Sequence, residues 1–263
     1  MQQNAKSTYL YIANPLIMAI RREFSSIITK MHRVDYSASL NANPMMGSGG
    51  TSSYMSDLTD KLTLVRDELL GSYRVGDLAK EWSVSFQSLR CNSLTRRFRR
   101  ALDLSRFTVQ TFVLHASIVK PLSESGKLKL TSDTTSLEFA ISQYLSSHSL
   151  SLSSIGDQHK ALRAFRPLLF LDNTELADEK KTSDVPMLIL LHHVLSRSSL
   201  QLPHQVHGWT EGEYVRWLNE HGEEERIKMV EGVVTSWEDK EEETEDRALM
   251  EILRAILQRR NAV

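Results

Sequence analysis

The sequence predicts an all-α protein built from antiparallel helices. Helix-breaking residues are scarce, since the 263 residues include only 11 glycines and six prolines. Apolar residues recur at spacings of three and four along most of the chain, and no long segment alternates apolar and polar residues as a strand would. Hydrophobic residues make up 41% of the chain, enough to bury a core, and we expect roughly eight to ten helices joined by short loops.

Residues 1–84 are predicted to form a helical segment interrupted by a loop. Asn14-Pro15 favours a helix start, with Asn as N-cap and Pro in the first turn. Glycine, serine and proline near residues 41–53 predict a flexible loop, and Val75 to Trp82 begins a third helix. Two apolar stripes mark the first two helices: Leu16, Ile17, Ile20, Phe24, Ile27, Ile28 and Met31, then Met55, Leu58, Leu62, Val65 and Leu69.

Residues 85–106 differ in charge from the rest of the chain. They carry six arginines and one aspartate, a net charge of +5, whereas the whole chain has a net charge of −1. We interpret 85–106 as a basic insertion, either an exposed loop or sequence that is not natively part of the fold. Phe98 and Phe107 interleave with the arginines, so contact with nucleic acid or acidic lipid is the alternative. The balanced overall charge favours no nucleic-acid partner.

Residues 107–263 are predicted to form a C-terminal helical bundle. Thr135 to Glu138 fits a capping box, and Pro167 is expected to kink a helix. Apolar residues from Met187 to Leu195 nearly encircle their helix, which predicts a place at the centre of the bundle. The other expected core positions are Leu137, Ile141, Tyr144, Leu145, Leu162, Phe165, Leu168, Leu169, Ile227, Val230, Val234, Trp237, Leu249, Ile252, Leu253, Ile256 and Leu257.

Three aromatic residues near the C-terminus form the candidate partner interface: Trp209, Tyr214 and Trp217. Thr210 and Glu213 complete a capping box, and Trp209 can fold onto Tyr214 as a hydrophobic staple. Tyr214 and Trp217 lie three residues apart and so share a helix face. Aromatic residues are favoured anchors of protein interfaces, although the same three residues could instead seal the terminal bundle.

The sequence predicts no catalytic, cofactor-binding or metal site, and we expect a protein that is not an enzyme. Met46 to Gly50 is glycine-rich but lacks a preceding strand and a following lysine. His204 and His207 lack cysteine partners and the usual helical spacing of metal ligands. His115 and Ser117 point about 200° apart on a helix, so they cannot act on one another as base and nucleophile.

Cysteine content and hydropathy bear on where the protein resides. The chain has one cysteine, Cys91, which excludes an intramolecular disulfide and fits a reducing compartment. No partner that would activate its thiol can be named. No apolar run approaches the roughly 18–20 residues of a membrane span, and the N-terminus lacks the apolar centre of a secretory signal. These features favour a soluble intracellular protein.

Three blocks of sequence resemble the fifth-subunit family of the conserved oligomeric Golgi complex. They are Phe112 to Leu122 with Glu124 to Leu128, then Leu162 to Phe170, then Trp209 to Leu218. They occur in the family's order and match its C-terminal portion, and the family's N-terminal coiled-coil region has no counterpart. The resemblance therefore implies a fragment, a truncated gene model or a split product. It also implies that 85–106 is an insertion or a retained intron.

The resemblance also implies a function. It points to stacked antiparallel helical bundles of the helical-rod tethering type, and to a non-enzymatic subunit of a Golgi vesicle-tethering complex in intra-Golgi retrograde transport. The implied partners are the other subunits of that complex and the vesicle-fusion machinery. The implied place is the cytosolic face of the Golgi, as a peripheral membrane protein held through the complex. The alternative is a helical scaffold or adaptor fragment without tethering activity.

Overall fold

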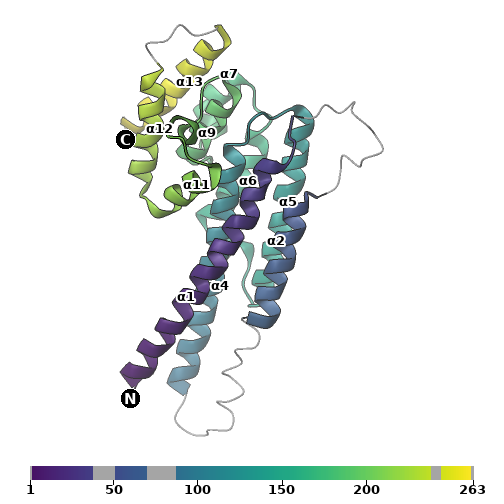
Figure 1. Cartoon of the computed structure of the whole chain (residues 1–263), viewed down its shortest axis with the longest axis vertical. Coiled ribbons are helices and arrows are strands. Elements are labelled where there is room, and N and C mark those ends of the chain that lie inside the picture. The colour runs from purple at the N-terminus through teal and green to yellow at the C-terminus, as the bar shows by residue number, and fades with distance from the viewer. Residues whose placement is uncertain (1, 38–50, 70–86, 238–243, 262–263) are drawn as a thin grey trace.

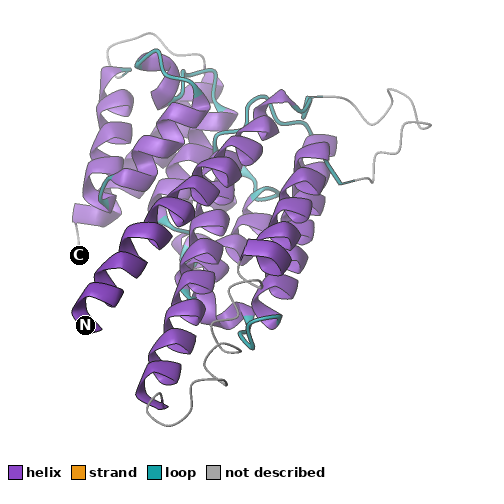
Figure 2. Cartoon of the chain, turned by 60° about the horizontal axis from the view of Figure 1, so that its bottom comes forward, coloured by secondary structure: helices purple, strands orange, loops and turns teal. Residues whose placement is uncertain are grey.

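Long helices dominate the structure, a computed structural model that describes residues 2–37, 51–69, 87–237 and 244–261. No strand occurs in those ranges (Figure 2), which confirms the all-α prediction. In chain order the elements are α1 (Gln2–Thr29), η1 (Lys30–Arg33), α2 (Ser53–Leu64), η2 (Val65–Leu69), α4 (Gln87–Ser117), α5 (Glu124–Ser146), η3 (Leu152–Ile155), α6 (Asp157–Leu168), α7 (Asn173–Ala177), α8 (Glu179–Thr182), α9 (Met187–Arg197), α10 (Pro203–Val206), α11 (Glu211–Glu220), α12 (Glu223–Ser236) and α13 (Thr244–Asn261).

Helices α1, α2, α4 and α5 run along the long axis of the molecule, and α7, α9, α11, α12 and α13 gather at the end opposite the N-terminus (Figure 1). Helix α4 joins the two groups, because it packs against α1, α5 and α6 and also against α9 and α11. The predicted apolar stripes face this shared core. Phe24, Met55, Phe112 and Phe165 are all completely buried.

The centre of the C-terminal group is α9, as its apolar sequence predicts. Every residue from Leu188 to Ser196 is buried. Helices α4, α12 and α13 all pack against it. Short helices lie in the segments between the longer ones, namely α7 and α8 within 172–184 and α10 within 201–208.

Two predicted helix starts are wrong. Helix α1 begins at Gln2 and carries Pro15 inside it, where proline removes only one backbone hydrogen bond of the helix. Helix α5 begins after Ser123, whose hydroxyl accepts a hydrogen bond from the Gly126 amide at 3.1 Å. Thr135 lies mid-helix and donates its hydroxyl back to the Thr131 carbonyl at 3.0 Å, which is the usual arrangement of threonine within a helix.

Residues 87–106 form the first part of α4, so the boundary expected at 106 falls inside a continuous helix. Ala101 and Leu104 are completely buried in the core. Arg106 donates hydrogen bonds to the carbonyls of Ile155 and Ser154 at 3.0 and 3.2 Å. The last turns of the basic segment therefore pack as part of the bundle. The predicted loop residues 41–50 and the predicted helix from Val75 to Trp82 lie outside the described residues.

A buried carboxylate joins α5 to the start of α2. Asp133 has no solvent exposure and accepts hydrogen bonds from the Ser52 amide at 2.9 Å, the Ser52 hydroxyl at 2.7 Å and the Tyr54 hydroxyl at 2.8 Å. The Tyr36 hydroxyl also donates to it, at 3.2 Å. A buried charge is tolerated when its lone pairs are satisfied in this way.

Among the described helices, none is long and apolar enough to cross a membrane.

Candidate protein-interaction surface

The candidate surface lies on α11 and the residues just before it. Thr210 caps the helix, since its hydroxyl accepts from the Glu213 amide at 3.3 Å and the Glu213 carboxylate accepts from the Thr210 amide at 2.9 Å. The predicted capping box is therefore confirmed. A Cβ at Gly212 would lie 3.2 Å from the Thr29 methyl group, so a small residue here lets α11 approach α1 closely.

Tyr214 lies on the inner face of α11 and is completely buried. Its hydroxyl is 2.8 Å from Nε2 of His192 on α9, and Nδ1 of His192 is 3.2 Å from the Ser117 hydroxyl on α4. Burial raises the pKa of Tyr214 and lowers the pKa of His192 to about 3, so both groups are neutral at pH 7. The chain Tyr214–His192–Ser117 links three helices by hydrogen bonds within the core.

Trp209 and Trp217 are half-buried and lie at the protein surface. Their ring centroids are 6.1 Å apart, and Trp209 lies 6.5 Å from the Tyr214 ring, as the predicted staple requires. Two histidines extend this pair into a row. His207 lies 5.4 Å from Trp209, and His221 stacks on Trp217 at 4.1 Å with a 20° interplanar angle. We call these four residues, His207, Trp209, Trp217 and His221, the aromatic row.

Sequence reasoning missed both histidines of the aromatic row. The spacing of Trp217 and His221 at i, i+4 on one helix was a usable signal. His207 gave none, because its contact with Trp209 depends on the turn at Gly208, which has a φ of +67°. The exposed charged side chains on α11 and in the first half of α12 are mostly acidic: Glu213, Glu220, Glu223, Glu224 and Glu225, against Arg216 and Lys228. An aromatic row that reaches the surface next to carboxylates suits contact with a partner that carries apolar and basic side chains.

A second group of histidines lies under α11. Nε2 of His32 is 2.9 Å from Nδ1 of His115, and His204 lies 3.9 Å from the Glu211 carboxylate. Burial lowers the pKa of His32 to about 4 and holds the pKa of His115 well below its usual range. A cavity of about 160 Å³ borders His32, His204 and Glu211. Within the described residues, no group of three or more histidine, cysteine, aspartate or glutamate side chains is placed to hold a metal ion.

His115 and Ser117 face different neighbours, as their helical spacing predicts. His115 contacts His32, whereas Ser117 donates to the Leu114 carbonyl at 2.8 Å and contacts His192. Ser117 and His192 have no solvent exposure. Their contact therefore joins α4 to α9 in the core. The glycine-rich residues 46–50 lie outside the described residues, and the side-chain surroundings of Cys91 are likewise outside the description.

The fold and the aromatic row define an all-helical bundle protein with an aromatic and acidic surface. Sequence similarity to curated proteins gives a more specific class. The chain is 30% identical over 225 residues to conserved oligomeric Golgi complex subunit 5 of Arabidopsis thaliana, which covers 85% of the chain and 25% of the relative. It is 26% identical to the Mus musculus subunit 5 over 85% of the chain and 25% of that relative.

A third relative agrees, the subunit 5 of Drosophila melanogaster, at 23% identity over 87% of the chain and 28% of the relative. These matches confirm the resemblance indicated by the three sequence blocks, and the chain spans about a quarter of the length of the curated relatives it matches. No family model matches the chain. No solved structure matches it either.

Proposed function

We propose that the chain acts as part of a Golgi vesicle-tethering complex, in intra-Golgi retrograde transport, through protein–protein contact rather than catalysis. The observation that carries this proposal is the similarity to three relatives named as subunit 5 of the conserved oligomeric Golgi complex over about 85% of the chain. The elongated helical bundle supports it, because stacked helices offer long surfaces to partner helices and need no cofactor.

The proposed partners are other subunits of the same complex, with the vesicle-fusion machinery as a second class of contact. Association with the cytosolic face of the Golgi would then be peripheral and would pass through the complex. The aromatic row is the proposed contact surface, since Trp209 and Trp217 are half-buried and Tyr214 is fully committed to the core. In this proposal, partner contact within the row is made by the two tryptophans and the histidines beside them.

A chimaera tests the proposal. In cells that lack their own subunit 5, the 263 residues would replace the matching segment of the Arabidopsis thaliana relative. We expect the chimaera to co-purify with the other subunits and to restore the return of Golgi-resident enzymes. A matched chimaera with Phe165→Ala, which removes a completely buried ring, should fail in both respects.

The adaptor alternative makes a different prediction for the same cells. A chain that serves only as a scaffold would let the chimaera assemble with the other subunits without restoring the return of Golgi enzymes. A chimaera that folds, as judged by its expression and protease resistance, and yet neither assembles nor restores transport would contradict the proposed function.

A further inference from the structure

A pocket of about 570 Å³ lies between α5 and α9, away from the aromatic row. Its walls come from the segment between α4 and α5, from α5, from α9 and from the residues that follow α9. The charged and titratable side chains in these walls are Lys120, Lys127, His193 and Arg197. None of the described residues that line the pocket is acidic. The volume is in the range of sites that bind small molecules.

Within the described ranges, two of the pocket's cations form hydrogen bonds only with backbone carbonyls. The Lys120 ammonium donates to the Leu200 carbonyl at 2.7 Å, and one nitrogen of the Arg197 guanidinium donates to the Leu169 carbonyl at 3.2 Å. Burial lowers the pKa of both side chains, because each is partly removed from water. No carboxylate among the described residues lies within ion-pair distance of either one. Arg197 also retains guanidinium N–H groups that could contact a ligand.

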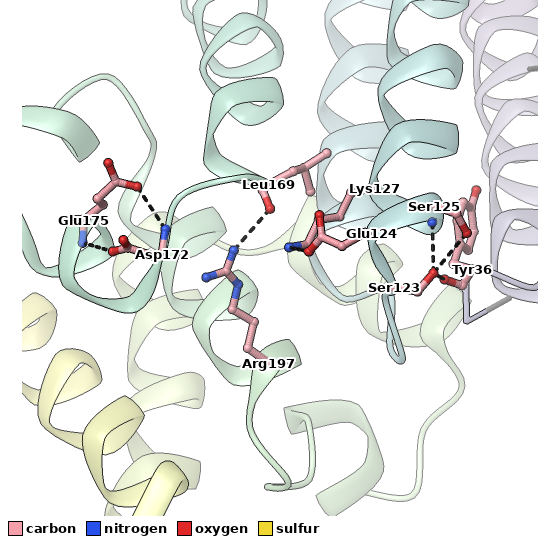
Figure 3. A network of polar contacts seen from close by, with 10 residues as sticks. Tyr36, Ser123, Glu124, Ser125, Lys127, Leu169, Asp172, Glu175 and Arg197 are labelled. Carbon is pink, nitrogen blue, oxygen red and sulfur yellow. Dashed lines mark hydrogen bonds and ion pairs between the residues drawn. The ribbon is translucent and has the colours of Figure 1, made fainter. Parts of the chain in front are cut away.

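The third cation, Lys127, has an ion-pair partner that a ligand can displace. Lys127 pairs with Glu124 at 2.6 Å, and the Glu124 side chain is 72% exposed. Figure 3 shows the Lys127 and Arg197 side chains extending toward one another from α5 and α9, with Glu124 beside Lys127. Carboxylates beyond ion-pair distance also act on the other two cations, Glu124 and then Asp172 on Arg197, and Asp246 on Lys120. Asp246 is itself held by the amide and hydroxyl of Ser199.

His193 supplies an independent sign that the pocket is built for a ligand. The residue is 1% exposed, and no atom of the described residues forms a hydrogen bond with its Nε2 atom. Burial, with the positive charges of Arg197 and Lys127, lowers its pKa to about 3, and the Leu168 carbonyl opposes the shift. The charges of Arg197 and Lys127 therefore act electrostatically on the His193 ring. Buried polar atoms without partners are rare in native proteins and call for a specific cause.

We propose that this pocket binds a phosphate group, with Lys120, Lys127 and Arg197 offsetting its charge and His193 bonding one of its oxygens. A phosphate between the cations would replace the water that they have lost and would release Lys127 from Glu124. Its negative charge would also favour a proton on Nε2 of His193, which could then donate to it. Arginine and lysine together are the usual ligands of phosphate, arginine through two parallel N–H groups.

The phosphate can come from a soluble phosphate ester or from a lipid headgroup, and binding assays separate the two. Calorimetric titration of the 263-residue chain with inorganic pyrophosphate at fixed ionic strength measures soluble binding. Co-sedimentation with vesicles of phosphatidylcholine and phosphatidic acid, against phosphatidylcholine alone, measures lipid binding. Saturable pyrophosphate binding without vesicle capture assigns a soluble ligand. Vesicle capture that pyrophosphate competes away assigns a headgroup.

Paired variants decide whether the pocket is responsible. Arg197→Gln and Lys127→Gln should each weaken pyrophosphate binding by about tenfold or more, the loss expected for a hydrogen bond between charged groups. The matched controls are Arg163→Gln on the exposed face of α6 and Lys129→Gln, two residues further along α5. They remove the same charge and should leave binding unchanged.

Two results would overturn the proposal. One is the absence of saturable binding both to pyrophosphate and to the phosphatidic acid vesicles. The other is an equal loss of binding in the pocket variants and in the controls, which would indicate attraction by overall charge. Circular dichroism checks the fold of each variant. Should Arg197→Gln not fold, Lys127→Gln decides alone, because its partner Glu124 is largely exposed.

Discussion

The Tyr214 hydroxyl lies 2.8 Å from Nε2 of His192, where the inner face of α11 meets the central helix α9. Both side chains are completely buried. This contact gives Tyr214 a different role from Trp209 and Trp217, the two other aromatic residues of the predicted interface. Tyr214 belongs to the core, and Trp209 and Trp217 remain at the surface, where another protein can reach them.

Removing the Tyr214 hydroxyl should destabilise the fold without changing the surface. Tyr214→Phe keeps the ring but leaves Nε2 of His192 without a partner, which costs about 1–3 kcal/mol for a buried polar group. Urea unfolding followed by circular dichroism measures the free energy of unfolding. An unfolding free energy equal to that of the unmodified chain would mean that this hydrogen bond does not form in solution.

Truncation of Phe165 on α6 should lower the free energy of unfolding more than most single substitutions. Phe165→Ala removes a completely buried ring and should lower the free energy of unfolding by about 3–5 kcal/mol, with a clear fall in melting temperature. Phe139→Ala serves as the matched control, because the Phe139 side chain on α5 is 63% exposed. Equal melting temperatures for the two variants would contradict the placement of α6 in the core.

Two glycines should respond in opposite directions to the same substitution. In Gly126→Ala, the added Cβ would lie 2.1 Å from the Tyr36 carbonyl oxygen, so α5 or the chain near Tyr36 must move. At Gly232 on α12, no other atom of the part of the chain that the structure describes lies within 4 Å of the added Cβ. Gly232→Ala should therefore raise the free energy of unfolding by about 0.5–1 kcal/mol, the usual helical preference for alanine.

Thermal melts of both glycine variants check this contrast. We expect a lower melting temperature for Gly126→Ala and a slightly higher one for Gly232→Ala. A Gly126→Ala protein as stable as the unmodified chain would show that α5 does not approach the Tyr36 backbone as closely as the structure indicates.

Stability should fall as the pH drops below about 6.5. Burial lowers the pKa of His32 to about 4 and of His192 to about 3, whereas an unfolded histidine titrates near 6.5. Above about pH 6.5 each ring is neutral in both the folded and the unfolded chain, so it does not change the free energy of unfolding. Between about pH 6.5 and 4 the unfolded chain binds protons that the folded chain does not, so each ring lowers the free energy of unfolding by up to about 1.4 kcal/mol per pH unit.

Urea unfolding at pH 7.5 and pH 5.5 measures this dependence. The unmodified chain should be clearly less stable at the lower pH. Replacing His207 by Gln should leave that difference unchanged, because the His207 side chain is exposed at the surface and lies outside the core. Equal stability of the unmodified chain at the two pH values would mean that the buried histidines are already protonated in the folded state or are accessible to water.

Core faces could be predicted from the sequence, because each depends on residues close together in the chain. Leu162, Phe165 and Leu168 follow the helical period and are buried. Helix ends were less predictable. Asn14-Pro15 and Thr135 carry the composition of helix starts, but packing of the long α1 and α5 outweighs those local signals.

The surface could be predicted only in part. The capping box and the staple of Trp209 on Tyr214 are local and follow from the spacing of residues. The hydrogen-bond partner of the buried Tyr214 hydroxyl is His192, which lies 22 residues away on another helix. The phosphate-site proposal draws on still more distant residues, since Lys120 and Arg197 lie in segments that no local pattern brings together. Tertiary contacts of this kind leave no periodic signal in one sequence.

The most direct test of the proposed tethering role is the effect of Trp217→Ala on co-purification with the other subunits of the conserved oligomeric Golgi complex. Trp217 is half-buried and stacks on His221, so the variant should keep its helical circular dichroism and cooperative melting. We expect co-purification to weaken by about tenfold, as for loss of an anchoring tryptophan, whereas the Phe139→Ala protein should assemble normally. A folded Trp217→Ala protein that assembles as well as the unmodified chain would contradict the proposed contact surface.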